Sequence, residues 1–283
     1  MKTNTTTIRP FLALLAATSL FGCSVKDDTI SPATPEEVAQ ADVTIFRGSE
    51  RIGRGVLVGY NKDGHDHVFF LTARHVVTYQ NISECDLTFA FGNGFKWPVR
   101  TQIDRWITTA PQFDSAWYEL NDAEKSELID KNALRYIPLE RTPSAPRGGM
   151  MPGTCIVKLH DFAAATPEAE LPTLMFFSNG AIKGTMYLAE GGNAPIPSLH
   201  TKVLKTCTSF IFPVRAAQLS LPGDSGGPAF VDLTINGKTY PALAGLVIGA
   251  NSILKINAIQ PIDEIYCEIG NCSRRLVDEK GLW

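Results

Sequence analysis

The stretch Gly223-Asp224-Ser225-Gly226-Gly227-Pro228 decides how the rest of this chain is interpreted. Glycines on both sides of a serine favour a tight turn with positive φ angles, which exposes the hydroxyl and frees the nearby N–H groups to meet a ligand oxygen. A serine hydroxyl is a weak nucleophile on its own, so it needs a base and a group that orients the base. The stretch therefore predicts a nucleophile, Ser225, whose partners lie elsewhere in the chain.

Candidates for both partners precede the serine. The apolar run at residues 69–73 predicts a strand, and His75 follows it directly. Residues 113–120 place Asp114 at the head of a second predicted strand. Taken singly, these residues are also compatible with a strand-end histidine, a loop aspartate and a glycine turn. The order histidine, aspartate, serine favours a joint site and excludes an α/β-hydrolase, where the serine comes first.

The segments Thr72-Ala73-Arg74-His75, Asp114-Ser115-Ala116 and 223–228 together resemble the trypsin/chymotrypsin-like serine peptidases, over roughly Val43 to Ile265. The resemblance implies an all-β fold of two six-stranded antiparallel barrels with the active site in the cleft between them. His75 and Asp114 would lie on one side of the cleft and Ser225 on the other. His75 would be the general base, Asp114 would orient it, and the N–H groups of Gly223 and Ser225 would form the oxyanion hole.

Three features depart from the family pattern. Pro222 favours a type II turn with Gly223, and the orientation of its central peptide decides whether the Gly223 N–H faces the oxyanion hole. Arg74 replaces the usual alanine before the histidine. The family's activation-cleavage site is absent near residues 42–45, so Asp224 needs another partner than a new amino terminus. We therefore expect the protein to fold without proteolytic activation. The alternative to a peptidase is a binding module that has the same fold but is catalytically impaired.

The resemblance also assigns a substrate pocket. Its base falls six positions before the nucleophile, at Leu219, and its wall falls on Ile248, Gly249 and Ala250. Burying a Lys or Arg head group against these uncharged residues would be unfavourable, whereas an apolar side chain would gain about 1.5 to 3 kcal/mol. The expected partner is a protein or peptide substrate cut after medium or large apolar residues.

The beginning of the chain resembles a bacterial lipoprotein. Residues 1–22 combine early positive charge with a short apolar run, and the run ends at a lipobox-like Leu20-Phe21-Gly22-Cys23. We expect a lipid on Cys23 and a flexible polar tether over residues 23–41. The alternative is an ordinary signal peptide cut elsewhere.

The tether composition bears on location. Ser24 fits sorting to the bacterial outer membrane, and Lys26-Asp27-Asp28 resembles the surface-export signal of some lipoproteins. A solvated polar tether that carries no sorting signal fits this segment equally well. The sequence thus predicts an exported protein attached to the outer membrane by its lipid, with cell-surface exposure left open.

The remaining chain divides at a stretch rich in Pro, Gly and Met. We expect a first barrel at 42–141, a linker at 142–153, a second barrel at 154–265 and a tail at 266–283. Short runs punctuated by Gly, Asn and Asp predict strands throughout, with a hairpin turn at Asn236-Gly237 and one surface helix at 122–134.

Composition limits the other partners. The net charge of −3 and the lack of a basic patch with interleaved aromatics give no support for nucleic-acid binding. No cysteine pair stands near a histidine at metal-ligand spacing, so we expect neither a metal nor another cofactor. Cys267 and Cys272 are the most plausible local disulfide, and Cys155 with Cys207 could join strands, leaving Cys85, but spacing alone does not fix the pairing.

Overall fold

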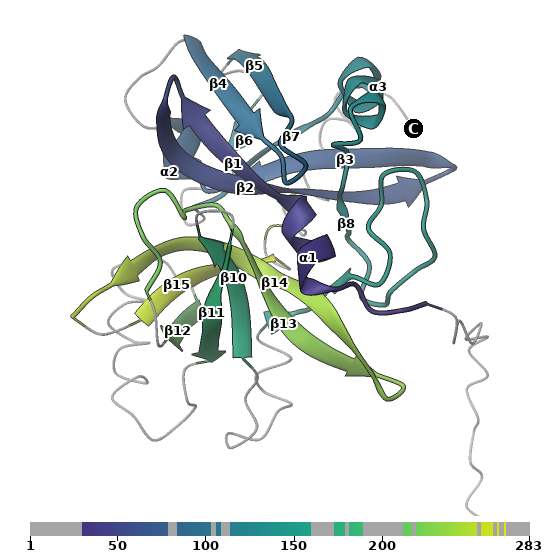
Figure 1. The fold of residues 1–283 in the computed structure, drawn as a ribbon, viewed down its shortest axis with the longest axis vertical. Helices are drawn as coiled ribbons and strands as arrows, with labels where there is room; N and C mark the ends of the chain where they lie inside the picture. The colour runs from purple at the N-terminus through teal and green to yellow at the C-terminus, as the bar shows by residue number, and fades with distance from the viewer. Residues whose placement is uncertain are drawn as a thin grey trace, which may run out of the picture.

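The computed structural model describes residues 30–78, 84–102, 106–108, 114–159, 173–178, 181–188, 212–216, 219–253, 256–262, 265 and 269. Its strands form two mainly antiparallel sheets, which lie one above the other in Figure 1. The first sheet comes from the first half of the chain and the second from the second half. The chain is therefore mostly β, as predicted.

The first sheet has the strand order β5-β4-β1-β2-β3-β7-β6, and β8 pairs in parallel with β2. Its strands are β1 (Asp42–Arg47), β2 (Glu50–Lys62), β3 (His65–Thr72), β4 (Glu84–Ala90), β5 (Lys96–Gln102), β6 (Ile107–Thr108), β7 (Ala116–Glu119) and β8 (Ile137–Pro138). Two positive-φ residues, Asp63 and Gly64, form the tight turn that joins the long hairpin β2–β3.

The second sheet has the order β13-β10-β11-β12-β15-β14-β9, with an additional pairing of β13 with β14. Its strands are β9 (Cys155–Ile156), β10 (Thr173–Ser178), β11 (Ala181–Leu188), β12 (Phe212–Ala216), β13 (Pro228–Ile235), β14 (Lys238–Asn251) and β15 (Ile256–Pro261). The predicted hairpin turn is confirmed, because Asn236 and Gly237 both have positive φ between β13 and β14.

The prediction of an antiparallel all-β fold agrees with the structure, but the finer prediction of two six-stranded barrels is not confirmed. Pairing of β13 with both β10 and β14 makes the second sheet return on itself. Among the described residues, however, the first sheet is an open path from β5 to β6 with β8 attached beside β2. The structure thus shows curled antiparallel sheets, and it does not confirm a pair of six-stranded barrels.

Helices are short and few among the described residues. They are α1 (Pro35–Val38), which continues into a 3₁₀ turn at Ala39–Ala41, α2 (Arg74–Thr78) and α3 (Asp122–Asp130). The side chain of Asn121 accepts a hydrogen bond from the Glu124 N–H and so begins α3, the predicted surface helix. This helix ends at Asp130, earlier than predicted; on it Leu128 is buried, whereas Ile129 is exposed.

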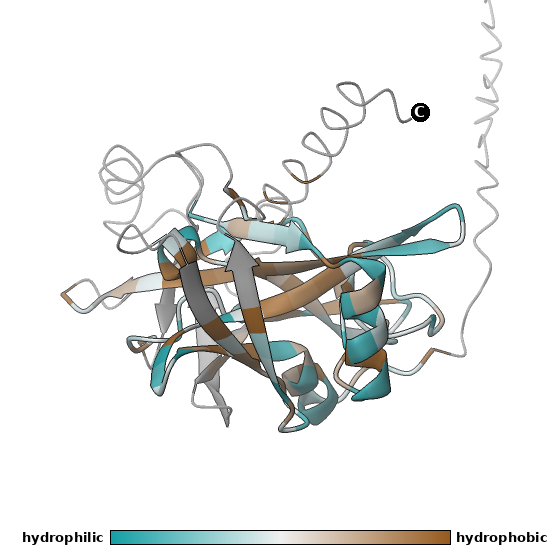
Figure 2. Ribbon diagram, turned by 90° about the horizontal axis from the view of Figure 1, so that it is seen from above, coloured by the Kyte–Doolittle hydropathy of each residue, from teal (hydrophilic) through white to brown (hydrophobic). Residues whose placement is uncertain are grey.

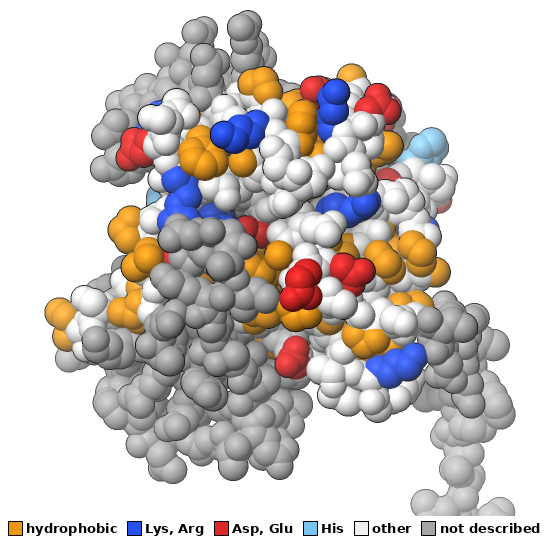
Figure 3. All heavy atoms as spheres, viewed as in Figure 1, with side chains coloured by type: hydrophobic (Ala, Val, Ile, Leu, Met, Phe, Trp, Pro, Cys, Tyr) orange, Lys and Arg blue, Asp and Glu red, His pale blue; other side chains and the backbone are white. Residues whose placement is uncertain are grey.

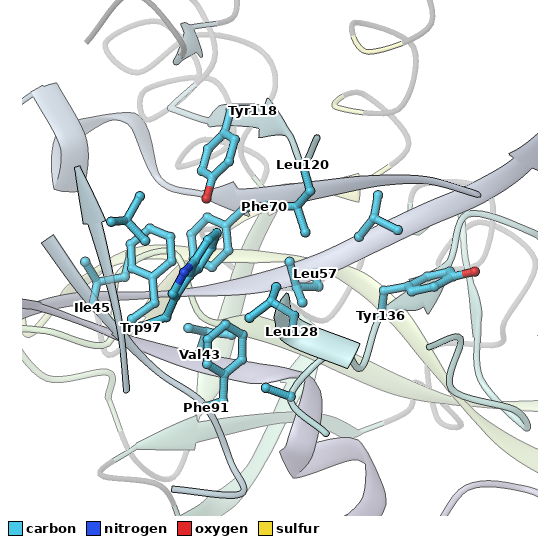
Figure 4. Packing of buried hydrophobic residues seen from close by; sticks show 14 of the residues in the cluster. Val43, Ile45, Leu57, Phe70, Phe91, Trp97, Tyr118, Leu120, Leu128 and Tyr136 are labelled. Carbon is cyan, nitrogen blue, oxygen red and sulfur yellow. The ribbon is translucent and has the colours of Figure 1, made fainter. Parts of the chain in front are cut away.

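Apolar side chains from both sheets pack into buried clusters. Figure 2 shows hydrophobic colouring along the middle of the strands and hydrophilic colouring at the end of the long hairpin at the right, β2–β3 in Figure 1. In the first sheet Phe70 and Phe89 stack with their ring centroids 4.1 Å apart, and the Trp97 ring packs edge-on against Phe89. Figure 4 shows Tyr118 beside Phe70. A second cluster joins the sheets, since it includes Phe69 and Trp117 from the first and Phe230 and Leu246 from the second.

Residues from the start and from the end of the described chain are also part of this second cluster, which lies between the sheets. Val38 and Ala41 are buried in it, as are Ile262, Ile265 and Ile269, which have helical conformation. The expected flexible tether at 23–41 is thus packed from Ile30 onward, and burial continues past 265 into the expected tail. The expected linker is also packed, because Met150 and Met151 are buried.

Candidate active site

The pairing of β3 with β7 brings His75 and Asp114 together. Thr72, the last residue of β3, pairs with Ala116, the first residue of β7. Because the strands are antiparallel, the segment that leaves β3 and the segment that enters β7 meet at the same edge. His75 lies on α2 just after β3, and Asp114 lies just before β7, as the sequence predicted.

The two side chains are in direct contact. His75 Nδ1 lies 2.6 Å from Asp114 Oδ2, and the His75 backbone N–H donates to Asp114 Oδ1 at 3.0 Å. An ionised carboxylate can only accept, so Nδ1 carries the proton and Nε2 of the neutral ring can accept one. The side chains of His75 and Asp114 are 43% and 25% exposed, respectively, so the imidazole is accessible from solvent.

The carboxyl group of Asp114 is held in its charged form. Partial burial by itself raises its pKa, but the hydrogen bonds from His75, the positive charge that the His75 ring carries when protonated and a smaller effect of Arg74 lower the pKa below the ordinary value of 3.8. Asp114 therefore remains a carboxylate at neutral pH. Arg74 also fixes the backbone, since its N–H donates to the Asp114 carbonyl at 3.2 Å.

The second sheet contributes a further hydrogen bond to Asp114. The side-chain oxygen of Gln260, on β15, accepts from the Asp114 N–H at 3.3 Å. Gln260 is buried, so this bond crosses between the sheets in a position shielded from water. It ties the position of the aspartate to the half of the molecule that carries Ser225.

The loop with Ser225 packs against β2 and the end of β3. The Arg54 N–H donates to the Ser225 carbonyl at 2.8 Å. A Cβ on Gly226 would lie 2.2 Å from the Arg54 carbonyl oxygen and 2.8 Å from the N of Ala73, two positions before His75. A Cβ on Gly53 would touch both the Ser225 carbonyl and Val76. The loop thus lies against the segment that carries His75, with only glycine fitting at the contact.

Residues 221–224 form a tight turn ahead of the serine. The Asp224 N–H donates to the Leu221 carbonyl at 2.9 Å, and Gly223 has φ +82°. A bond between the first and fourth residues with φ near +80° at the third is typical of a type II turn, as the Pro222-Gly223 pair predicted. The carboxylate of Asp224 closes the turn by accepting from the Leu221 N–H at 2.8 Å.

The remaining backbone groups of the loop are largely paired within the protein. The Gly226 N–H donates to the Val247 carbonyl at 2.6 Å, and the Gly227 N–H donates to the Asp224 carbonyl at 3.1 Å. Within the described part of the chain, no hydrogen bond is found for the N–H groups of Gly223 and Ser225. These are the two donors expected for an oxyanion hole.

Asp224 is fully buried and has found a cationic partner. Its Oδ1 lies 3.4 Å from Nη2 of Arg51, a residue of β2. A second buried pair lies nearby, where the side chain of Arg54 donates two hydrogen bonds to Asp42. Since an unpaired buried charge is costly, these arginines let the loop and the beginning of β1 carry buried carboxylates.

The expected pocket residues lie on two neighbouring segments of the second half. Leu219 and Ile248 are half-buried, Ala250 is exposed, and a Cβ on Gly249 would meet no atom within 4 Å. Asn257 joins the segments, because its side chain accepts from the Ser220 N–H at 2.6 Å and its backbone pairs with Ala250. Ile248 is the extra residue of a β-bulge between β14 and β15, a feature common beside active sites.

Sequence reasoning missed Arg51, Asn257 and Gln260 as residues that position the site. A signal for two of them exists in β15, where Asn257 and Gln260 interrupt an otherwise apolar strand and are both buried. Buried polar side chains are almost always hydrogen-bonded, so such interruptions mark structural contacts. Arg51 has no comparable signal, because a charged residue near the start of a strand is ordinary.

The other predicted sites have different outcomes. Cys23 lies outside the described residues, as do Cys207, Cys267 and Cys272. Cys155, which could have joined strands through a disulfide, is a buried free thiol. In the described ranges no cluster of His, Cys, Asp and Glu is suited to hold a metal ion. Nor does any described helix have the length and hydrophobicity needed to cross a membrane.

Comparison with known proteins gives little guidance. No protein-family model matches the chain, and no curated protein matches it. One matching solved structure comes from work on how aromatic interactions drive the coupled folding and binding of the intrinsically disordered Sesbania mosaic virus VPg protein. It is 15% identical, covers 83% of this chain and 92% of that chain, and has a TM-score of 0.45. A likeness of this size carries no argument about this chain.

Proposed function

We propose that this chain is a serine endopeptidase of the trypsin/chymotrypsin type, exported and tethered to a membrane, that hydrolyses peptide bonds through an acyl-enzyme. The observation that carries the proposal is the 2.6 Å contact of His75 Nδ1 with Asp114, made at the same edge against which the Ser225 loop packs. The two-barrel architecture of that family is part of the proposal.

In the proposed reaction, Ser225 Oγ attacks the carbonyl carbon of the scissile bond while Nε2 of His75 accepts the hydroxyl proton. The carbonyl oxygen becomes an oxyanion, for which the unbonded N–H groups of Gly223 and Ser225 are available as donors. His75 then gives its proton to the leaving amine, and an acyl ester remains on Ser225. A water molecule, deprotonated by His75, hydrolyses that ester and restores the serine.

A fluorophosphonate probe tests the proposal, because covalent labelling requires the nucleophile, the base and the oxyanion donors together. We expect the full-length protein to be labelled and Ser225→Ala to be unlabelled. Ser144→Ala is the matched control, since Ser144 lies in the connection between the sheets and bonds to Met150. A folded wild-type protein that is not labelled would overturn the proposal and leave the binding module as the better function.

The substrate side of the proposal is a protein or peptide with an apolar residue before the cut. Leu219, Ile248, Gly249 and Ala250 present no charge there, and open space beside Gly249 is compatible with a bulky side chain. Cleavage of a peptide library decides this point, because a dominant preference for Lys or Arg would refute the pocket assignment. On the face shown in Figure 3, acidic and basic side chains are interspersed over the described residues.

The membrane attachment is proposed to be the lipid on Cys23, with the protein at the bacterial outer membrane. Cys23→Ala should move the protein from the membrane fraction to the soluble fraction after cell lysis. Cys155→Ala is the matched control, since Cys155 is a buried free thiol and should not change fractionation. Unchanged fractionation of Cys23→Ala would refute the anchor without affecting the proposed chemistry.

A further inference from the structure

Arg51 makes contact with every residue from Pro222 to Asp224. Its Nη2 donates to the Pro222 carbonyl at 3.1 Å and lies 3.4 Å from Asp224 Oδ1. Its side chain also covers Gly223, because a Cβ there would lie 2.8 Å from Arg51 Nε. The side chain is 20% exposed, so the guanidinium is largely shielded from water. One residue of the first sheet thus contacts three of the four residues of the turn that precedes Ser225.

The hydrogen bond to Pro222 fixes a direction. In a trans peptide the C=O and N–H groups point in opposite directions, and the structure has no cis peptide among its described residues. The carbonyl of Pro222 points toward Arg51, so the Gly223 N–H of the same peptide points away from Arg51. This N–H is one of the two unbonded donors of the loop. A rotation of that peptide would break the bond to Arg51.

The local shape of β2 brings Arg51 to the turn. The pairing of β1 with β2 shifts between Ile45 and Phe46, so that Ile45 faces Gly53 and Phe46 faces Arg51. The extra residue, Ile52, breaks the normal alternation of side chains, and bulges of this kind re-aim the neighbouring side chain. Arg51 and Gly53 therefore both contact the serine loop, one at the turn and one at the Ser225 carbonyl.

We propose that Arg51 is a positioning residue that keeps the Gly223 N–H in the orientation needed to stabilise the oxyanion, and that it makes the site active without proteolytic processing. This inference rests on the proposed function. A guanidinium remains protonated at all physiological pH values and can bind a carboxylate and a carbonyl at once. The turn is thus held by a side chain present from the time of folding.

Arg51 has two roles at the turn: it pairs with the buried Asp224 carboxylate, and it donates a hydrogen bond to the Pro222 carbonyl. Two variants separate these roles. Arg51→Met leaves Asp224 buried without a cation and also frees the Pro222 carbonyl. In Arg51→Met/Asp224→Asn the buried charge is gone, while the Pro222 carbonyl is still free. An asparagine oxygen can keep the hydrogen bond from the Leu221 N–H. The double variant should therefore recover thermal stability but not the orientation of the peptide.

The experiment measures the rate of fluorophosphonate labelling at Ser225 together with the melting temperature. We expect Arg51→Met to reduce the labelling rate by about 100-fold to 1,000-fold, the range for loss of one oxyanion donor. The double variant should melt closer to wild type and still label slowly. The pH at which labelling rises should not change, because His75 and Asp114 keep their contact. Arg147→Met is the matched control, since it removes an arginine–carboxylate pair with Glu140 outside the site.

The outcomes separate this inference from the proposed function. If the wild-type protein and the folded double variant were labelled at the same rate, the role of Arg51 would be refuted, but the proposed function would not. Recovery of labelling to the wild-type rate in the double variant, after its loss in Arg51→Met, would show that Arg51 only neutralises Asp224, which also refutes it. A wild-type protein that is never labelled would refute the proposed function and this inference with it.

Discussion

Replacing Gly226 by alanine tests whether the serine loop depends on its close contact with β2. Gly226 has φ +85°, and an added Cβ would lie 2.2 Å from the Arg54 carbonyl oxygen and 2.3 Å from Thr72 Oγ1. The left-handed conformation costs an alanine about 1 to 2 kcal/mol. The overlap with these two atoms, one of them a backbone oxygen, costs about 1 to 3 kcal/mol more. We therefore expect Gly226→Ala to lower the free energy of unfolding by about 2 to 5 kcal/mol.

Gly237→Ala is the matched control. Gly237 has φ +77°, but an added Cβ would meet no atom within 4 Å, so this change carries the conformational cost alone. Urea unfolding of both variants and wild type gives the difference, provided that the slopes with denaturant agree. Gly226→Ala should also be labelled by fluorophosphonate much more slowly, whereas Gly237→Ala should be labelled normally. Equal destabilisation by the two variants would refute the steric contact between the loop and β2.

Three further changes probe the site and its surroundings. The lowered pKa of Asp114 means that its charge stabilises the fold above pH 3.8, and this contribution is lost as pH falls through the still lower folded pKa. The stability gap between wild type and Asp114→Asn should shrink over that fall, as urea unfolding at several pH values would show. Burial raises the pKa of Cys155 to about 12, so iodoacetamide should modify this thiol only after unfolding, as mass spectrometry would show. Gly249→Leu should fill the open space beside Gly249 in the proposed pocket and slow cleavage after large apolar residues by about 10- to 100-fold relative to small ones, as measured with matched peptides.

Each of these has a contradicting result. A stability gap for Asp114→Asn that stays constant down to acid pH would show that the carboxylate is not held by His75. Rapid alkylation of Cys155 in the folded protein would contradict its burial. Equal cleavage rates for large and small residues in Gly249→Leu would place the pocket elsewhere. Ile253→Ala is the control for the last test, because Ile253 is 89% exposed and lies just beyond the end of β14, outside the proposed pocket.

The sequence was most informative where chemistry depends on local backbone shape. Gly223 and Gly226 have positive φ, and the predicted turn at Asn236 and Gly237 is present. These features are readable because only a few residue types tolerate such conformations. The strand flanks of His75 and Asp114 were also predictable, since each follows or precedes a clear apolar run. Their contact then depends on the β3–β7 pairing, which residue order suggested only through family resemblance.

Long-range contacts were the part that sequence could not supply. Arg51 and Asp224 are far apart in the chain, and nothing local to either residue indicates the other. The composition of the segment at 30–41, which is polar and carries prolines, predicts a tether. In the structure Thr34 caps α1 in a reciprocal pair with Glu37, and Val38 is buried at the joint between the sheets. A short segment with one or two buried residues has too weak a pattern to predict packing.

The docking of Ile30 limits how far the proposed enzyme can reach from a membrane. The Ile30 carbonyl accepts hydrogen bonds from Lys238 at 3.3 Å and from Tyr240 at 3.2 Å, so the chain is fastened to the β13–β14 hairpin from that residue onward. With a lipid on Cys23, only residues 24–29 would link the lipid to the docked Ile30, and a fully extended chain from Cys23 to Ile30 spans at most about 25 Å. The β13–β14 hairpin must then stay close to the bilayer. Substrates would be confined to proteins that are themselves held at the membrane surface or have segments that come down to it.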